Sequence, residues 1–217
     1  MKIHNFATSP SLMSQYMAEL RDVTVQKDSM RFRKNLERIG EIMAYEISKT
    51  LKYKEKKIET PLKKTKADVV SEPVVLATIF RAGLPFHQGF LNFFDGAENA
   101  FVSAYRKYKE KGDFEVCIEY LASPRLDGKT LVLCDPMLAT GISMEMSYKA
   151  LLTKGTPKHV HVASVVSSEQ AVKYVQEHFP EATTTLWTAA IDPELNPHSY
   201  IVPGLGDAGD LAFGEKD

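Results

Sequence analysis

Residues 130–143 read TLVLCDPMLATGIS, and this stretch decides the expected fold. An apolar run from Thr130 to Cys134 ends at Asp135, and a turn of small residues leads into a predicted helix, Ser143 to Thr153. Backbone N–H groups at a helix N-terminus and the helix dipole both favour negative charge. An acid at the end of the strand suits a sugar hydroxyl or a metal better than a phosphate. We therefore expect this turn to bind a phosphorylated sugar.

The residues of this turn distinguish it from other phosphate-binding motifs. Gly141 allows close backbone approach, and Thr140 and Ser143 supply hydroxyl groups. It lacks the Gly-Lys-Ser/Thr triplet of a Walker loop and the spaced glycines of a dinucleotide-binding fingerprint. The alternative interpretation, an ordinary strand–helix turn capped by Thr140, does not explain why an acid stands at the strand end before Pro136.

The composition is that of a single globular domain. The chain has 217 residues, of which 44% are hydrophobic, and a formal net charge of −1. This balance gives no electrostatic reason to expect nucleic acid or an anionic membrane as a partner. No apolar run approaches the roughly 18 residues of a membrane span, and the N-terminus has no signal-peptide core. We expect one domain over residues 1–217 and a cytoplasmic protein.

Hydrophobic periodicity predicts an α/β fold with a mainly parallel central sheet flanked by helices. Apolar residues recur every three or four positions from Asp28 to Leu51, which indicates an amphipathic helix. A second helix is expected from Ser168 to His178. The predicted strands are Val74–Phe80, Ala100–Tyr105, Glu115–Leu121, Thr130–Cys134, His159–Val166 and Thr184–Ile191. In such a sheet a ligand binds beyond the carboxyl ends of the strands.

A Lys-rich segment, Lys52 to Lys66, lies between the first helix and the first buried strand. We interpret residues 52–68 as a solvated β-arm, and a mobile charged loop is an equally good interpretation. This arm is also the one candidate for a basic patch that binds RNA, although it lacks the interleaved aromatic residues typical of such patches.

Two arginines follow predicted strands. Arg81 comes directly after a buried strand, where a charge is costly unless it is paired or faces a ligand. Its planar guanidinium suits a pyrophosphate, and the alternative is a structural salt bridge to a neighbouring acid. Arg106 ends another predicted strand and begins a polar segment, Lys107 to Asp113, that we expect to be a moving loop. Taken alone, Arg106 fits a solvated basic loop at least as well.

The end of the chain, residues 192–217, is rich in Gly, Pro and Asp. Residues 200–210 read YIVPGLGDAGD. Glycines allow a backbone to come very close to a planar ligand, and main-chain N–H and C=O groups can recognise the donors and acceptors of a base. We expect this C-terminal segment (192–217) to be a base-binding hood. The alternative is a flexible Gly-rich tail.

Together these motifs resemble the phosphoribosyltransferases. The sequence DPMLATG, residues 135–141, is similar to the version in the uracil phosphoribosyltransferase family, where Pro136 replaces a second acid. The resemblance covers most of the chain. It extends to Arg31-Phe32-Arg33, Tyr45-Glu46, Ile79-Phe80-Arg81-Ala82-Gly83-Leu84, Ala104-Tyr105-Arg106 and the stretch 200–210.

The resemblance implies a reaction in which uracil and 5-phosphoribosyl 1-diphosphate (PRPP) give UMP and diphosphate, as in pyrimidine salvage. It assigns catalytic roles to Asp135, Arg106 and Asp207, and uracil contacts to Ile201, Gly206, Asp207 and Ala208. The implied PRPP-binding residues are Arg81, Arg106, Asp135, Pro136, Met137, Leu138, Ala139, Thr140, Gly141, Ile142, Ser143 and Asp207. Mg²⁺ is expected to arrive mainly with PRPP, so no direct protein ligand to a metal is assigned.

The resemblance also implies a homodimer or larger homo-oligomer, and GTP as an activator, because some members of the family are activated by GTP. Three positions depart from the family pattern: Ile142 stands where a second Gly is usual, and Pro85 and Leu211 replace other residue types. These departures affect fine specificity more than the reaction. Two alternatives stay open: a phosphoribosyltransferase for another base, and a non-catalytic PRPP-binding regulator of the same fold.

Overall fold

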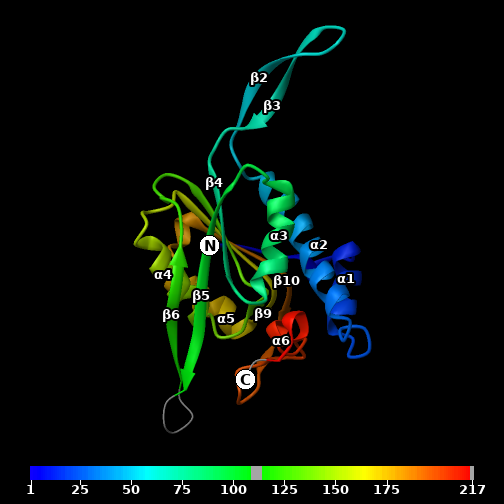
Figure 1. Cartoon of the computed structure of the whole chain (residues 1–217), viewed down its shortest axis with the longest axis vertical. Helices are drawn as coiled ribbons and strands as arrows, with labels where there is room; N and C mark the ends of the chain where they lie inside the picture. Colours follow the sequence, from blue (N-terminus) through cyan, green and yellow to red (C-terminus); the bar gives the residue numbers. More distant parts are fainter. Residues whose placement is uncertain (109–113, 216–217) are drawn as a thin grey trace.

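The computed structural model of this protein describes residues 1–108 and 114–215. A central β-sheet carries helices on both faces, as Figure 1 shows. The strand order is β1-β10-β9-β7-β4-β5-β6, and β8 pairs with β9. The pairs are parallel except for β5 with β6, which is antiparallel. The predicted fold class, a mainly parallel α/β sheet, is therefore confirmed.

The strands of this sheet follow the apolar runs of the sequence. Their bounds are β1 Lys2–Asn5, β4 Val74–Phe80, β5 Glu98–Tyr108, β6 Phe114–Ala122, β7 Thr130–Cys134, β8 Met137–Leu138, β9 His159–Ser168 and β10 Thr184–Asp192. Strand β4 shows why the runs are continuous. Its side chains alternate between two core clusters, with Leu76 in one and Val75 and Ala77 in the other, so both faces of the strand are covered.

Helices α1 (Leu12–Arg21), α2 (Ser29–Ser48) and α3 (Gly83–Phe93) cover one face, and α4 (Ile142–Leu152) and α5 (Glu169–His178) cover the other. Asp28 caps α2 by accepting from the Arg31 N–H, and Ser168 caps α5 by accepting from the Ala171 N–H. The 3₁₀ turns are η1 (Phe6–Thr8) and η2 (Glu181–Thr183). Among the described residues, no helix is both long and apolar enough to span a bilayer.

The prediction of a polar loop beginning at Arg106 was wrong at its start. Strand β5 continues to Tyr108, and Arg106 stands opposite Val116 of β6. Main-chain pairing with β6 keeps this polar stretch extended, although it has no apolar run. The rest of the predicted loop, 109–113, lies outside the described residues. Elements β1, α1 and α3 were not predicted, since each was too short or too irregular to show a clear period.

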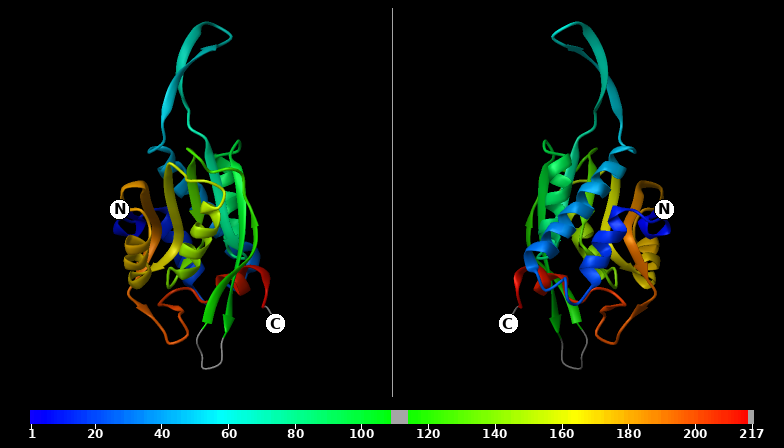
Figure 2. Two further views of the ribbon diagram at one scale, coloured as in Figure 1. Left: turned by 90° about the vertical axis from the view of Figure 1, so that its left-hand side faces the viewer. Right: turned by 90° about the vertical axis from the view of Figure 1, so that its right-hand side faces the viewer.

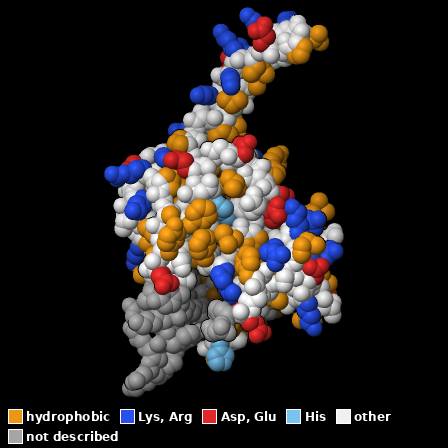
Figure 3. All heavy atoms as spheres, viewed as in Figure 1, with side chains coloured by type: hydrophobic (Ala, Val, Ile, Leu, Met, Phe, Trp, Pro, Cys, Tyr) orange, Lys and Arg blue, Asp and Glu red, His pale blue; other side chains and the backbone are white. Residues whose placement is uncertain are grey.

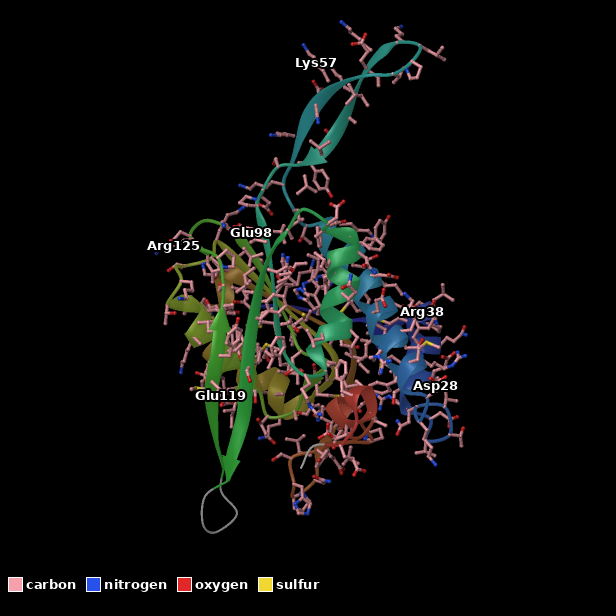
Figure 4. All side chains as sticks on the ribbon, in the orientation of Figure 1. Asp28, Arg38, Lys57, Glu98, Glu119 and Arg125 are labelled. Atoms are coloured by element: carbon pink, nitrogen blue, oxygen red, sulfur yellow. The ribbon has the colours of Figure 1, made fainter. Side chains whose placement is uncertain are left out.

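Two segments extend from the ends of the sheet. Strands β2 (Tyr53–Glu59) and β3 (Lys64–Val70) form an antiparallel hairpin that projects from the body (Figure 3). Lys57 of this hairpin lies far from the helices and the sheet (Figure 4). At the opposite end the chain forms β11 (Glu194–Leu195), β12 (Ile201–Val202) and α6 (Ala208–Phe213). Figures 1 and 2 place α6 at the end of the body opposite the hairpin, and it packs against α2.

Candidate active site

The 135–143 turn leaves the carboxyl end of β7 and is fixed by backbone hydrogen bonds to β9. The Asp135 N–H donates to the carbonyl of Ala163 at 3.1 Å, and the Pro136 carbonyl accepts from the N–H groups of Val165 and Val166 at 3.1 and 2.9 Å. The Asp135 carboxylate accepts from the Met137 N–H at 3.2 Å. The turn is thus an extension of the sheet, and its acid is half-buried at the strand end.

Helix α4 begins at Ile142, one residue earlier than predicted, and its N-cap is Gly141 with φ +85°. A Cβ at Gly141 would lie 2.7 Å from the Tyr174 ring of α5, so the position combines a left-handed conformation with a close contact. The Thr140 hydroxyl accepts from the Ile142 N–H at 3.4 Å, a local capping contact. Gly141 has no side chain with which to cap the helix. The first N–H groups of a helix lack intrahelical acceptors and point out of its N-terminus, which here adjoins the turn.

A buried acid, Glu145, links helix α4 to helix α5. Glu145 lies in the first turn of α4, where it accepts from the Tyr174 hydroxyl at 2.6 Å and pairs with Lys149 at 2.6 Å. Burial opposes its ionisation, but these partners outweigh burial and lower the pKa of Glu145. The same hydrogen bond raises the pKa of Tyr174 to about 12. The carboxylate is therefore paired with the charge of Lys149 and hydrogen-bonded by the neutral Tyr174 hydroxyl.

Two depressions lie near this turn, and the residues that line the smaller one are better suited to bind a phosphorylated sugar. A concavity of about 30 Å³ is lined by Asp135, Met137, Leu138, Ala139, Thr140, Gly141, Ser143 and Met144. A wider, open depression of about 360 Å³ lies on α5 and is lined by Glu169, Gln170, Lys173, Tyr174, Glu177 and Pro193. The second has long polar side chains from one helix, whereas the first combines an acid with a helix N-terminus. We assign the site to the first.

The predicted base-binding residues lie on the C-terminal segment. Ile201 and Ala208 are buried, whereas Gly206, with φ +92°, is exposed. Asp207 is the N-cap of α6 and accepts from the N–H groups of Gly209 and Asp210 at 2.9 and 3.0 Å. The segment therefore presents exposed main chain at Gly206 next to an acid that a helix cap holds in one orientation.

Long-range contacts from arginines fix this segment. Arg21 of α1 forms a bidentate pair with Asp192, with both N–O distances at 2.8 Å, and donates to the Gly204 carbonyl at 3.2 Å. Arg33 of α2 donates to the Ala212 carbonyl at 2.6 Å. Asp192 also accepts from the Gly204 N–H at 2.8 Å. The sequence pattern did not identify the arginine contacts, because their partners are more than a hundred residues away.

Arg81 is also directed at the C-terminal segment. Its guanidinium pairs with Asp210 at 2.5 Å and donates to the Gly214 carbonyl at 3.0 Å. This salt bridge is the alternative weighed for Arg81 from the sequence. Arg106 lies on β5, and its side chain lies outside the described part of the chain.

Shared packing brings the turn and the C-terminal segment together. Met137 and Ala139 of the turn pack against the core cluster that contains Ile201 and Ala208. Ser168 at the end of β9 donates to the Ala139 carbonyl at 2.5 Å. Within residues 1–108 and 114–215, no group of three or more His, Cys, Asp or Glu side chains lies close enough to hold a metal ion. A site with these parts suits an anionic sugar phosphate beside a planar, neutral ring.

Comparison with known proteins agrees with this chemistry. A family model described as uracil phosphoribosyltransferase matches residues 7–215. A protein of that name from Porphyromonas gingivalis is 58% identical over 216 residues, which cover 100% of each chain. A protein of the same name from Pyrococcus furiosus is 39% identical over 216 residues, which cover 98% of this chain and 90% of the relative.

Solved structures support the fold. A protein from Aquifex aeolicus superposes with a TM-score of 0.86 and 29% identity, and the match covers 98% of both chains. A hypoxanthine phosphoribosyltransferase from Staphylococcus aureus gives a TM-score of 0.52 at 13% identity, covering 85% of this chain and 83% of the other. The second likeness concerns the fold alone.

Proposed function

The chain belongs to the uracil phosphoribosyltransferase family, and on that premise we propose that it converts uracil and PRPP to UMP and diphosphate. The bond from C1 of the ribose to the diphosphate oxygen breaks, and a bond from N1 of uracil to C1 forms as N1 loses its proton. The observation that carries this proposal is the match to the family over residues 7–215, which includes both the 135–143 turn and the C-terminal segment.

We propose that the 135–143 turn binds the 5′-phosphate. Helix α4 begins at Ile142, at the end of this turn. The first N–H groups of a helix lack intrahelical acceptors and point out of its N-terminus, where the helix dipole adds partial positive charge. The ion pair of Glu145 with Lys149 reduces the repulsion that an acid in the first turn would otherwise exert on the phosphate, and the Tyr174 hydroxyl holds the carboxylate in place. Ile142 is half-buried, and its N–H group can turn from the long 3.4 Å contact with the Thr140 hydroxyl to the phosphate, so its side chain is compatible with this role.

Asp135 is proposed to stabilise the ribose. As diphosphate leaves, positive charge develops on the ribose ring, and a carboxylate fixed at the end of β7 interacts more strongly with that charge than with the ground state. Its hydrogen bond from the Met137 N–H holds the carboxylate in place. This role needs orientation and charge, and it requires no proton transfer by Asp135.

The C-terminal segment is proposed to bind uracil, with contacts from Ile201, Gly206, Asp207 and Ala208. Uracil has two carbonyl acceptors and two N–H donors, so exposed main chain at Gly206 can match it without a charged partner. Arg81 and Arg106 are proposed to bind the diphosphate. The family relationship supports both assignments.

We propose that Mg²⁺ accompanies PRPP, where it neutralises charge on the diphosphate. The described side chains favour a metal that is carried by the substrate, because Asp207 is already committed to capping α6 through one oxygen. Asp207 remains the carboxylate that would contact a water of that ion.

The test of this function is UMP formation from PRPP with uracil, cytosine, hypoxanthine or orotate as the acceptor. Uracil is expected to be used far better than the other three. A preference for another base would replace uracil with that base. No turnover with any base, together with measurable PRPP binding, would favour the non-catalytic regulator.

We also propose that the chain forms a homodimer or larger homo-oligomer and responds to GTP. The β2–β3 hairpin exposes apolar side chains, including Leu62 at 97% and Tyr53 at 45% exposure, away from the body. Mass measurement in solution with and without GTP tests both points. A monomer at assay concentration, or turnover that is unchanged by GTP, would reject the corresponding part.

A further inference from the structure

The guanidinium of Arg81 is enclosed by α6 and the residue that follows it. Nη2 pairs with the Asp210 carboxylate at 2.5 Å, and Nη1 donates to the Gly214 carbonyl at 3.0 Å. A Cβ added to Gly209 would lie 3.0 Å from Nη2 and 3.5 Å from Nε. Both terminal nitrogens of this guanidinium thus donate to the C-terminal segment. A diphosphate that takes the two N–H groups used here must displace Asp210 and the Gly214 carbonyl.

The Arg81–Asp210 ion pair can exchange its carboxylate for another anion. The side chains of Arg81 and Asp210 are 35% and 30% exposed, so water reaches both. Partly exposed pairs contribute little to folding stability. A diphosphate carries several negative charges and binds guanidinium through paired hydrogen bonds, so it competes well with a single carboxylate.

Helix α6 has other attachments that do not involve Arg81. Ala208 and Ala212 are buried in the core, and Arg33 donates to the Ala212 carbonyl. Release of Arg81 therefore frees Asp210 and the Gly214 carbonyl while the rest of the helix stays attached. The N-cap of this helix, Asp207, and its first residue, Ala208, belong to the proposed uracil site.

We propose that Asp210 is a positioning residue that couples the two substrate sites, an inference that rests on the proposed function. Without PRPP, Asp210 holds Arg81 against α6. When PRPP binds, its diphosphate replaces Asp210 as the partner of Arg81. Helix α6 then loses one of its two arginine contacts before uracil binds. Binding of PRPP and binding of uracil are then coupled through Arg81, and each substrate changes the affinity for the other by the same factor.

Asp210→Asn tests this competition because the amide keeps the size of the side chain and removes its charge. We expect magnesium diphosphate, titrated calorimetrically, to bind roughly three-fold more tightly to this variant, the change expected for losing a partly exposed ion pair. The KM for PRPP should fall with it. A merely structural role for Asp210 would weaken binding, so the sign of the change separates the two.

Glu215→Gln is the matched control, since it removes the same charge from an exposed acid of the same segment. It should leave diphosphate affinity unchanged. An unchanged or weaker affinity in Asp210→Asn would overturn the proposal, and so would an equal gain in both variants. If the wild type forms UMP while Asp210→Asn binds diphosphate like the wild type, the coupling fails and the function stands. If the wild type forms no UMP, the function itself fails.

Discussion

The 135–143 turn and the C-terminal segment are proposed to bind the two substrates, and they are held in different ways. The turn is fixed by main-chain hydrogen bonds to the neighbouring strand β9. The C-terminal segment is fixed by side chains of Arg21, Arg33 and Arg81, whose partners are 171, 179 and 129 residues away. A turn bonded into a sheet is formed before the ligand arrives. A segment held by guanidinium groups can exchange those contacts for ligand contacts.

The largest expected effect is a loss of activity without a loss of stability, caused by a substitution in the turn. Asp135→Asn should lower kcat/KM for PRPP by about 10³-fold, because it removes the charge that is proposed to face the ribose. The fold should survive, since the amide oxygen can still accept from the Met137 N–H. Steady-state assays and thermal melting measure both. Glu119→Gln, an exposed acid on β6, is the control (Figure 4). Full activity in Asp135→Asn would sink the assigned role.

The second prediction breaks the attachment of the C-terminal segment. Arg21→Met should leave the Asp192 carboxylate, whose side chain is 7% exposed, without its bidentate partner. The cost is about 3 kcal/mol. We expect the KM for uracil to rise far more than the Kd for PRPP, since the turn does not depend on Arg21. An equal loss of both affinities would mean that the two regions are not held independently.

The third prediction strains the turn without touching the C-terminal segment. Gly141→Ala places a Cβ 2.7 Å from the Tyr174 ring at φ +85°, at a cost of about 2 kcal/mol. The KM for PRPP should rise roughly thirty-fold, and uracil affinity should change little. Gly96→Ala is the control, because its added Cβ meets nothing within 4 Å. Wild-type kinetics in Gly141→Ala would show that the turn adapts.

The smallest expected effect is a loss of folding stability at low pH, which arises in strands β9 and β10. Burial lowers the pKa of His161 on β9 to about 3, and its Nδ1 accepts from the Trp187 Nε1–H of β10. The folded pKa lies below the unfolded value of about 6.5, so the unfolded chain binds the extra proton and stability falls as pH drops below that value. From pH 7.5 to 5.5 the loss attributable to His161 is about 1.4 kcal/mol.

Urea unfolding at the two pH values measures this loss, and His161→Gln should reduce it. The Gln amide oxygen can still accept from Trp187. His4 and His159 also have lowered pKa values and add in the same direction. A wild type that is equally stable at both pH values would contradict the assigned burial.

The sequence predicted the sheet and the turn because their determinants are local. Continuous apolar runs such as Val74–Phe80 predict strands that are buried on both faces, and Gly141 marks a bend that only a small residue tolerates. Strand β5 was underestimated at its polar end, because main-chain pairing with β6 extends it beyond the apolar run.

The contacts of the C-terminal segment could not be predicted in the same way. Helix α6 has six residues, too few to show a period. Asp210 stood within a quoted motif, but nothing in a linear pattern connects it to Arg81. Tyr174 likewise looks like an ordinary surface position until α5 packs against Gly141. Family resemblance supplied the residues proposed to contact ligands, whereas the residues that hold them in place became visible only in three dimensions.

Hydrogen exchange measured by mass spectrometry, with and without PRPP and Mg²⁺, tests the contrast between the two regions most directly. With uracil absent, the main-chain amides of Asp135, which donates to β9, and of Met137 and Leu138, which pair with β9 as strand β8, should keep their exchange rates on PRPP binding. Amides of residues 209–214 should exchange faster as Arg81 leaves Asp210. Equal protection of both regions by PRPP, or slower exchange confined to α6, would contradict the account.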